Sequence, residues 1–237
     1  MESTVLFGRI AGMALTATAV TATATALTTA PAWAAGHSVF MPGVLSPSTQ
    51  PVTGKSSGSI ALATSSGGVM TCVDTAASKA LTTTGTVRVG AVVTDPPPTG
   101  WLTGLMFSNC TISGLVATVT PQPWSLSLPY PTASGVTAAQ LGNVKFTVNI
   151  PAIPCSATFQ GSTSSNGYIN GKHTNPTSAG AASTLSLPVG SPNNLRATAV
   201  SATCPLSIVR WGDLAVFGGV IELRGVNSTA NEGPTIT

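Results

Sequence analysis

Charged residues are scarce in this sequence, at only 6% of its 237 positions, against about 25% in a typical soluble protein. Aromatic residues reach 5%, and there are two histidines. The few cations are scattered singly along the chain. Nucleic-acid binding needs a basic patch that follows the phosphates, so we expect no nucleic-acid partner.

Closely spaced cysteine pairs are also missing. Structural zinc sites usually draw their ligands from pairs such as C-x-x-C, so we expect no metal and no cofactor. An even number of widely spaced cysteines is typical of disulfides formed in an oxidising compartment. Of the three possible pairings we predict Cys72 with Cys110 and Cys155 with Cys204, because each pair brackets several expected strands and joins segments that can be neighbours in a meander.

The first 34 residues have the layout of a signal peptide. Arg9 precedes an uncharged run of apolar and small residues from Ile10 to about Thr29. Ala32 and Ala34 then satisfy the A-x-A preference of signal peptidase, so we predict cleavage after Ala34. The run is rich in threonine and alanine, which favours a cleaved leader over an anchor, and no later run is long enough to span a membrane. We therefore expect a secreted, extracellular protein with no membrane span in its mature form.

The rest of the chain shows the period-2 alternation of β-strands. Apolar residues alternate with polar ones over residues 144–150 and 124–128, which predicts strands with one buried and one wet face. Clusters of turn-forming residues separate further short runs. These runs lie at residues 60–64, 86–93, 115–120, 157–160, 185–187, 195–200 and 214–223. We predict an all-β fold, an antiparallel β-sandwich or barrel stapled by the two disulfides.

The same patterns divide the chain into three parts. We expect the signal peptide at residues 1–34, a partly ordered lead-in rich in Pro, Ser and Gly at 35–58, and a single all-β domain at 59–237. The length of the last part suits one domain with a sizeable core.

Two formal motif matches fail on their context. Residues 54–58 match the G-x-S-x-G nucleophile elbow around Ser56, but that elbow needs a strand before the serine and a helix after it. Here we expect a coil before it and a strand from Ile60. Residues 167–172 stop one residue short of a P-loop, and we interpret them as a hairpin turn.

The remaining catalytic candidates are few. We expect His37 and His173 in exposed loops, where they are unsuited to activate a nucleophile. A glycosidase needs a carboxylate pair, and Asp74 or Asp95 with Asp213 is the least implausible one. We therefore predict no catalytic residues.

Aromatic side chains are the other candidates for function. Trp124 belongs to an alternating apolar face, and Trp101 and Trp211 lie close in sequence to cysteines, so we expect all three to pack in the core. Tyr130 and Tyr168 are flanked by Pro, Asn and Gly, and they are weak candidates for a binding surface.

Several segments together carry a resemblance. They are residues 105–111, 123–126, 203–206 and 212–215, and with them the chain from about Ser59 resembles a family of uncharacterised secreted proteins of Streptomyces and related actinomycetes. The resemblance implies a signal peptide, a β-rich domain and two cysteine pairs. It brings no established activity, ligand or catalytic residue.

These observations predict a non-catalytic extracellular or cell-envelope protein that acts as a binding or structural module. Its partner would be a surface glycan, a small apolar ligand or another protein, held by loops at one end of the domain. The alternative is a secreted hydrolase acting on glycans.

Overall fold

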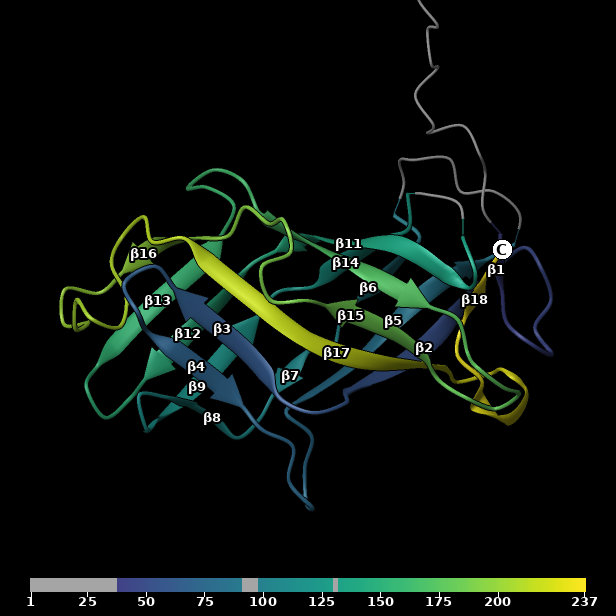
Figure 1. The fold of residues 1–237 in the computed structure, drawn as a ribbon, viewed down its shortest axis with the longest axis horizontal. Coiled ribbons are helices and arrows are strands. Elements are labelled where there is room, and N and C mark those ends of the chain that lie inside the picture. The colour runs from purple at the N-terminus through teal and green to yellow at the C-terminus, as the bar shows by residue number, and fades with distance from the viewer. Residues whose placement is uncertain (1–37, 91–97, 130–131) are drawn as a thin grey trace, which may run out of the picture. The chain divides into compact units, whose positions relative to one another are not determined.

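Apolar and polar residues alternate along most strands of the computed structural model, which describes residues 38–90, 98–129 and 132–237 (Figure 1). β5 (Leu81–Val89) is typical, because every second residue from Leu81 to Val89 is buried while the intervening threonines and Arg88 face outward. One face of such a strand packs and the other meets water. The prediction of an all-β fold is confirmed.

Eight strands close into an antiparallel barrel, which we call the first ring. Hydrogen-bonded neighbours follow the order β15, β14, β11, β10, β6, β5, β2, β17, and β17 pairs back with β15. Closure leaves none of these strands as an open edge. The members besides β5 are β2 (Ser48–Ser56), β6 (Gly100–Leu102), β10 (Trp124–Ser127), β11 (Val136–Val144), β14 (Gly167–Thr174), β15 (Ser183–Leu187) and β17 (Ala215–Gly225).

A second ring begins where β17 leaves the first. Residues 215–218 of β17 pair with β3, whereas residues 221–225 pair with β2. From β3 the sheet continues through β4, β8, β9, β12 and β13 to β16. This ring also closes, because Arg196 pairs with Leu214 immediately before β17. Its strands are β3 (Ile60–Thr64), β4 (Val69–Cys72), β8 (Cys110–Ile112), β9 (Leu115–Pro121), β12 (Phe146–Ile150), β13 (Cys155–Gln160) and β16 (Arg196–Val200).

Two glycines lie where β17 passes from one ring to the other. A Cβ atom added at Gly219 would meet the Ile60 side chain, and one added at Gly218 would meet the Val189 side chain at 2.5 Å. Glycine permits this close approach because it has no side chain. In Figure 1 the yellow strand β17 accordingly runs from the second ring on the left to the first ring on the right.

One aromatic cluster joins the two interiors. The Trp124 ring of β10 lies 5.8 Å from Phe217 and 6.3 Å from Phe146, measured between ring centroids. Phe159 stacks on Phe146 at 5.3 Å. All four side chains are buried, and tilted or edge-on aromatic pairs at these separations are favourable. The prediction that Trp124 belongs to the core is confirmed, and the described residues form one compact unit within residues 31–237.

Both predicted disulfides form, and both belong to the second ring. Cys72 and Cys110 are directly opposite each other on β4 and β8. Cys155 of β13 is bonded to Cys204, in the segment that follows β16. The pairing chosen from the sequence is therefore confirmed.

Short elements complete the described fold. β1 (Val39–Phe40) and β18 (Thr235–Ile236) pair with each other, and Val39 and Ile236 are buried. Asn175, just beyond β14, exchanges two 2.8 Å hydrogen bonds with the Ile236 backbone, so this small sheet is fastened to the first ring. The remaining elements are β7 (Met106–Phe107), which pairs with β5, and a 3-10 turn, η2 (Thr229–Asn231).

Two expectations about local structure were wrong. Residues 48–56, expected in a partly ordered lead-in, form β2 between β5 and β17. Its inward positions include Gly54 and Ser56, which lack the bulk that marks a strand in the sequence. Residues 167–172, interpreted as a hairpin turn, belong to strand β14. The predicted signal peptide, His37, Asp95 and Tyr130 lie outside the described residues.

Candidate functional site

Just after strand β4, Asp74 accepts hydrogen bonds at both of its carboxylate oxygens and is the centre of a cluster. Its Oδ1 accepts hydrogen bonds from the Ser56 hydroxyl at 2.5 Å and the Ala80 N–H at 2.8 Å. Its Oδ2 accepts the Lys79 ammonium at 2.7 Å and the Gly58 N–H at 3.3 Å. Burial alone would raise the pKa of Asp74, but these donors outweigh it and hold the pKa well below its ordinary value.

Ser56 has a structural position in this cluster. The residue is fully buried, its hydroxyl donates to Asp74, and its Oγ accepts the Leu81 N–H at 3.1 Å. Strand β2 does enter the motif, contrary to the expected coil, yet strand β3 follows it rather than a helix. The G-x-S-x-G match therefore lacks the geometry of a nucleophile elbow.

A shallow hollow of about 430 Å³ lies beside this cluster. Its lining consists of four hydroxyl residues, two alanines and one lysine: Thr75, Ser78, Thr82, Ser108, Ala76, Ala77 and Lys79. The Lys79 ammonium is already paired with Asp74, and the Ser78 N–H donates to the Thr75 hydroxyl at 3.0 Å. Thr75, Ser78 and Lys79 of the hollow thus already form hydrogen bonds with other groups of the protein.

Asp213 organises a second cluster on the segment between β16 and β17. Its Oδ1 accepts the hydroxyls of Ser65 and Ser66 at 2.7 and 2.9 Å, and its Oδ2 accepts the Arg210 N–H at 2.7 Å. Burial would raise the pKa of Asp213, but these hydrogen bonds and the charge of Arg210 lower it.

The two described aspartates of the hydrolase alternative lie in separate hydrogen-bonded clusters. Asp74 and Asp213 share no hydrogen-bond partner, since each has its own set of donors. Both have lowered pKa values, so neither is suited to hold a proton near neutral pH as the general acid of such a pair must.

The segment that Asp213 organises, residues 201–214, exposes a group of apolar side chains, and we call it the Trp211 loop. Trp211 is 72% exposed, Leu206 66% and Leu214 53%. Two other apolar residues of the loop, Ile208 and Val209, are buried inside the second ring. In Figure 1 this loop lies at the left-hand end, beyond β16.

The loop is fixed along its length. The Cys155–Cys204 disulfide ties its beginning, the Thr64 hydroxyl donates to the Ile208 carbonyl at 2.7 Å, and the Arg210 side chain donates to the Leu206 carbonyl at 2.9 Å. The exposed residues are therefore presented by an ordered segment.

The expectation that Trp101 and Trp211 pack in the core was wrong. Trp101 is 38% exposed on β6 because its neighbours Gly100 and Leu102 take the inward positions. Trp211 is outside because Ile208 and Val209 fill the interior beside the disulfide. In the sequence, Trp101 alternates with Gly100 and Leu102, and this pattern could have identified Trp101 as outward-facing. No such pattern surrounds Trp211.

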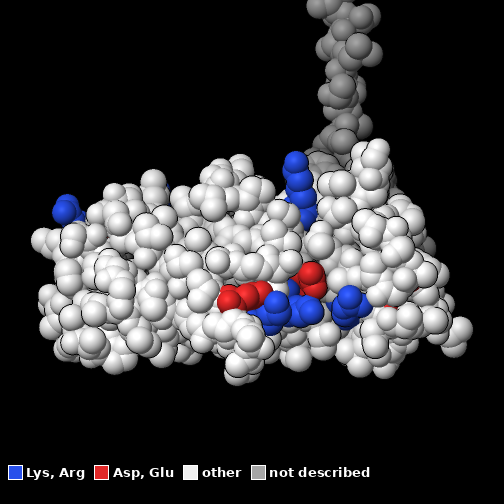
Figure 2. Space-filling model, turned by 60° about the horizontal axis from the view of Figure 1, so that its bottom comes forward, with Lys and Arg blue, Asp and Glu red and all other residues white. Residues whose placement is uncertain are grey.

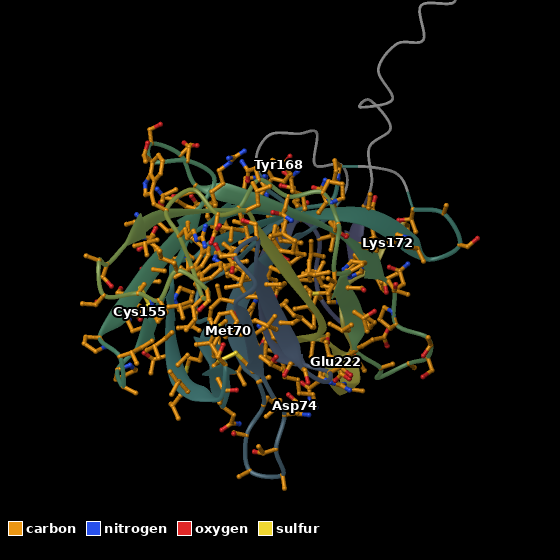
Figure 3. All side chains as sticks on the ribbon, turned by 60° about the vertical axis from the view of Figure 1, so that its left-hand side comes forward. Met70, Asp74, Cys155, Tyr168, Lys172 and Glu222 are labelled. Carbon is orange, nitrogen blue, oxygen red and sulfur yellow. A yellow bond between two sulfur atoms is a disulfide. The ribbon has the colours of Figure 1, made fainter. Side chains whose placement is uncertain are left out.

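Tyr168, a weak binding candidate, is half-buried on β14. In Figure 3 it lies on the upper side of the ribbon, while Asp74 and Glu222 lie on the lower side. Among the candidates that the structure describes, neither Asp74 nor Asp213 shares a hydrogen bond with it.

His173, expected in an exposed loop, is fully buried on β14. It faces inward opposite Thr137 and Leu185, and neither ring nitrogen has a hydrogen-bond partner among the described residues. Burial lowers its pKa to about 4. His173 and Ser56 are not neighbours in the first ring, because strands β15 and β17 lie between β14 and β2.

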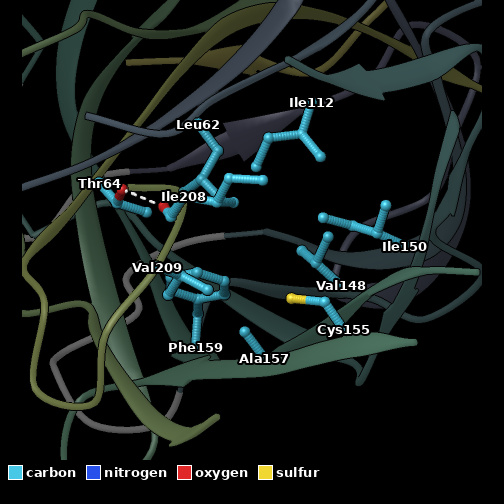
Figure 4. Close-up of a pocket in the computed structure, with 10 residues that line it drawn as sticks. All are labelled: Leu62, Thr64, Ile112, Val148, Ile150, Cys155, Ala157, Phe159, Ile208 and Val209. Atoms are coloured by element: carbon cyan, nitrogen blue, oxygen red, sulfur yellow. Dashed lines mark hydrogen bonds between the residues drawn. The ribbon is translucent and has the colours of Figure 1, made fainter. Parts of the chain in front are cut away.

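A small cavity lies in the interior of the second ring. The cavity drawn in Figure 4 measures about 10 Å³, and apolar side chains such as Leu62, Ile150 and Phe159 surround it. That volume is close to the minimum for one water molecule, so this cavity is too small for an apolar ligand.

Charge is distributed unevenly over the described residues. The strands β3, β4, β8, β9, β12 and β13 contain no Asp, Glu, Lys or Arg. In Figure 2 the left-hand part of the surface is correspondingly almost all white, and most charges gather to the right of it. Lys55 of β2 forms an ion pair with Glu222 of β17 at 3.7 Å.

Within the described part of the chain, no group of three His, Cys, Asp or Glu side chains is arranged to hold a metal ion. No helix in that part is long and apolar enough to cross a membrane. Comparisons with protein-family models, with curated proteins and with solved structures found no match, so function has to be argued from this chain's own residues.

Proposed function

We propose that this chain is an exported, non-catalytic binding module of the extracellular space or cell envelope, and that the Trp211 loop is its binding surface. The observation that carries the proposal is Trp211 at 72% exposure on an ordered loop that also exposes Leu206 and Leu214. Exposed apolar groups of this kind mark interaction sites, and tryptophan is the residue most enriched at binding hot spots.

The order of the loop supports this role. A binding surface that is already fixed loses little conformational freedom when a partner arrives. The disulfide at Cys204 and the hydrogen bonds of Asp213 supply that order without using the exposed side chains. The core does not use the exposed side chains, because Ile208 and Val209 already fill the interior beside the loop.

Export is part of the proposal. Four oxidised cysteines suit an oxidising compartment, and the sequence of residues 1–34 has the layout of a signal peptide. Sequencing the N-terminus of protein recovered from the culture medium should find Ala35 first. An intact Met1 on that protein would contradict the predicted cleavage.

The binding surface is tested with labelled protein and intact cells of the producing species. Trp211→Ala should reduce cell binding at least about tenfold, in line with the loss of a hot-spot tryptophan. Trp101→Ala is the matched control, because it removes an exposed tryptophan from β6 of the first ring, and it should leave binding unchanged. Equal binding by both variants and the parent would refute the proposed surface.

A further inference from the structure

We propose that the Trp211 loop binds a surface of anionic phospholipid, with Trp211 and Leu206 entering the interface and two arginines beside the phosphates. This inference rests on the proposed function, because it names the occupant of the same surface.

The apolar side chains suit a membrane interface. The indole ring has an apolar body and one N–H, and tryptophan is enriched at the headgroup level of membranes. Leu206 and Leu214 add aliphatic surface on the same loop, at 66% and 53% exposure. Shallow burial of such groups is how proteins bind a lipid surface without spanning it.

Arg196, Arg210 and Asp213 give the loop and its neighbouring strand a small net positive charge, because both arginines are exposed and the single carboxylate is buried. Arg210 precedes Trp211 and is exposed, and Arg196 is exposed opposite Leu214 where the second ring closes. Asp213 is 9% exposed and accepts three hydrogen bonds within the loop. Six strands of the second ring contain no carboxylate that would repel a negative surface. These strands are β3, β4, β8, β9, β12 and β13. Each basic residue close to an anionic lipid surface contributes a modest attraction, on the order of 1 kcal/mol.

The remaining polar groups favour lipid over a sugar. Recognition of a glycan by a stacked ring also needs side chains that hydrogen-bond to its hydroxyls. At this loop the Asp213 carboxylate is occupied, and the Arg210 Nε donates to the Leu206 carbonyl. The exposed side chains available to a partner are therefore mainly apolar, together with the arginine guanidinium groups and the Ser207 hydroxyl.

The test is co-sedimentation of the exported, fully oxidised protein with lipid vesicles. One set contains phosphatidylcholine alone and the other includes about 30% phosphatidylglycerol, whose negative charge attracts basic residues. We expect at least about fivefold more protein in the pellet with the anionic vesicles, falling as salt screens the attraction. Trp211→Ser and Leu206→Ser should each abolish most of this binding, Arg210→Gln should reduce the preference for anionic vesicles, and Trp101→Ser should behave like the parent.

The outcomes separate this inference from the proposed function. Pelleting that persists in Trp211→Ser, or no pelleting with either vesicle, overturns the lipid assignment. If Trp211→Ala still loses binding to cells in that case, the binding surface stands and its occupant is a protein or a glycan. If neither the vesicle nor the cell assay depends on Trp211, both proposals fail. Circular dichroism of each variant checks that loss of binding is not loss of folding.

Discussion

At the scale of single residues, His173 links the stability of the fold to pH. The pKa of His173 is lowered by burial from 6.5 to about 4, so between these values the unfolded chain binds a proton that the folded chain does not. Folding stability therefore falls as pH drops through this window, by about 3 kcal/mol when it has been crossed. Urea unfolding at pH 7 and pH 4.5 should show most of this loss.

His173→Leu provides the control for that pH dependence. It removes the titrating ring and leaves an apolar side chain beside Leu185, so the loss between pH 7 and pH 4.5 should largely disappear. Asp74 and Asp213 do not interfere, because their lowered pKa values put their losses of stability below this window. An undiminished loss in the leucine variant would assign the effect to other groups.

Asp213 is the residue on which the order of the Trp211 loop depends. Asp213→Ala removes both acceptor oxygens, so the Arg210 N–H and the Ser65 and Ser66 hydroxyls lose their common partner. A buried group left unsatisfied in this way costs about 1–3 kcal/mol. We expect faster hydrogen exchange over residues 201–214, with the first ring unchanged. Unaltered protection of the loop would show that the disulfide and Ile208 suffice to hold it.

At the scale of elements, each disulfide stabilises the fold only while both of its cysteines are present. Closing a loop of 38 residues between Cys72 and Cys110 is worth about 4 kcal/mol in the chain-entropy description. Cys72→Ala and Cys110→Ala should therefore lower the melting temperature by similar amounts, and the double variant should be little worse than either. The same near-equality is expected for Cys155 and Cys204, measured by circular dichroism under non-reducing conditions. A double variant much worse than both single variants would reveal a role for the cysteines beyond the bond.

The elements also show where the sequence was informative. Strands such as β12 and β5 follow from alternating large apolar residues, and the cysteine pairing follows from the expected order of strands. The sequence did not predict strand β2, because its inward positions include Gly54. The space beside this glycine is filled by Thr83 and Leu223 from neighbouring strands. Trp211 was misplaced for a similar reason, since competition with Ile208 and Val209 for one interior is decided in three dimensions.

At the scale of the whole domain, the two rings share a strand and a core. β17 pairs with β3 at one end and with β2 and β15 at the other. The Phe217 ring lies 5.8 Å from Trp124 of the first ring and 6.2 Å from Phe146 of the second. A strand and an aromatic contact common to both rings should couple their unfolding.

Phe217→Ala tests this coupling. Removing a buried phenylalanine costs about 3–5 kcal/mol, and both rings should feel it because the cavity opens between them. Native-state hydrogen exchange should therefore show amides of β5 and β14 in the first ring losing protection together with those of β12 and β13 in the second. Val116→Ala, at an exposed position of β9, is the control and should change neither. Loss of protection confined to the second ring would mean that the first ring is stable by itself and that β17 joins two separately folding units.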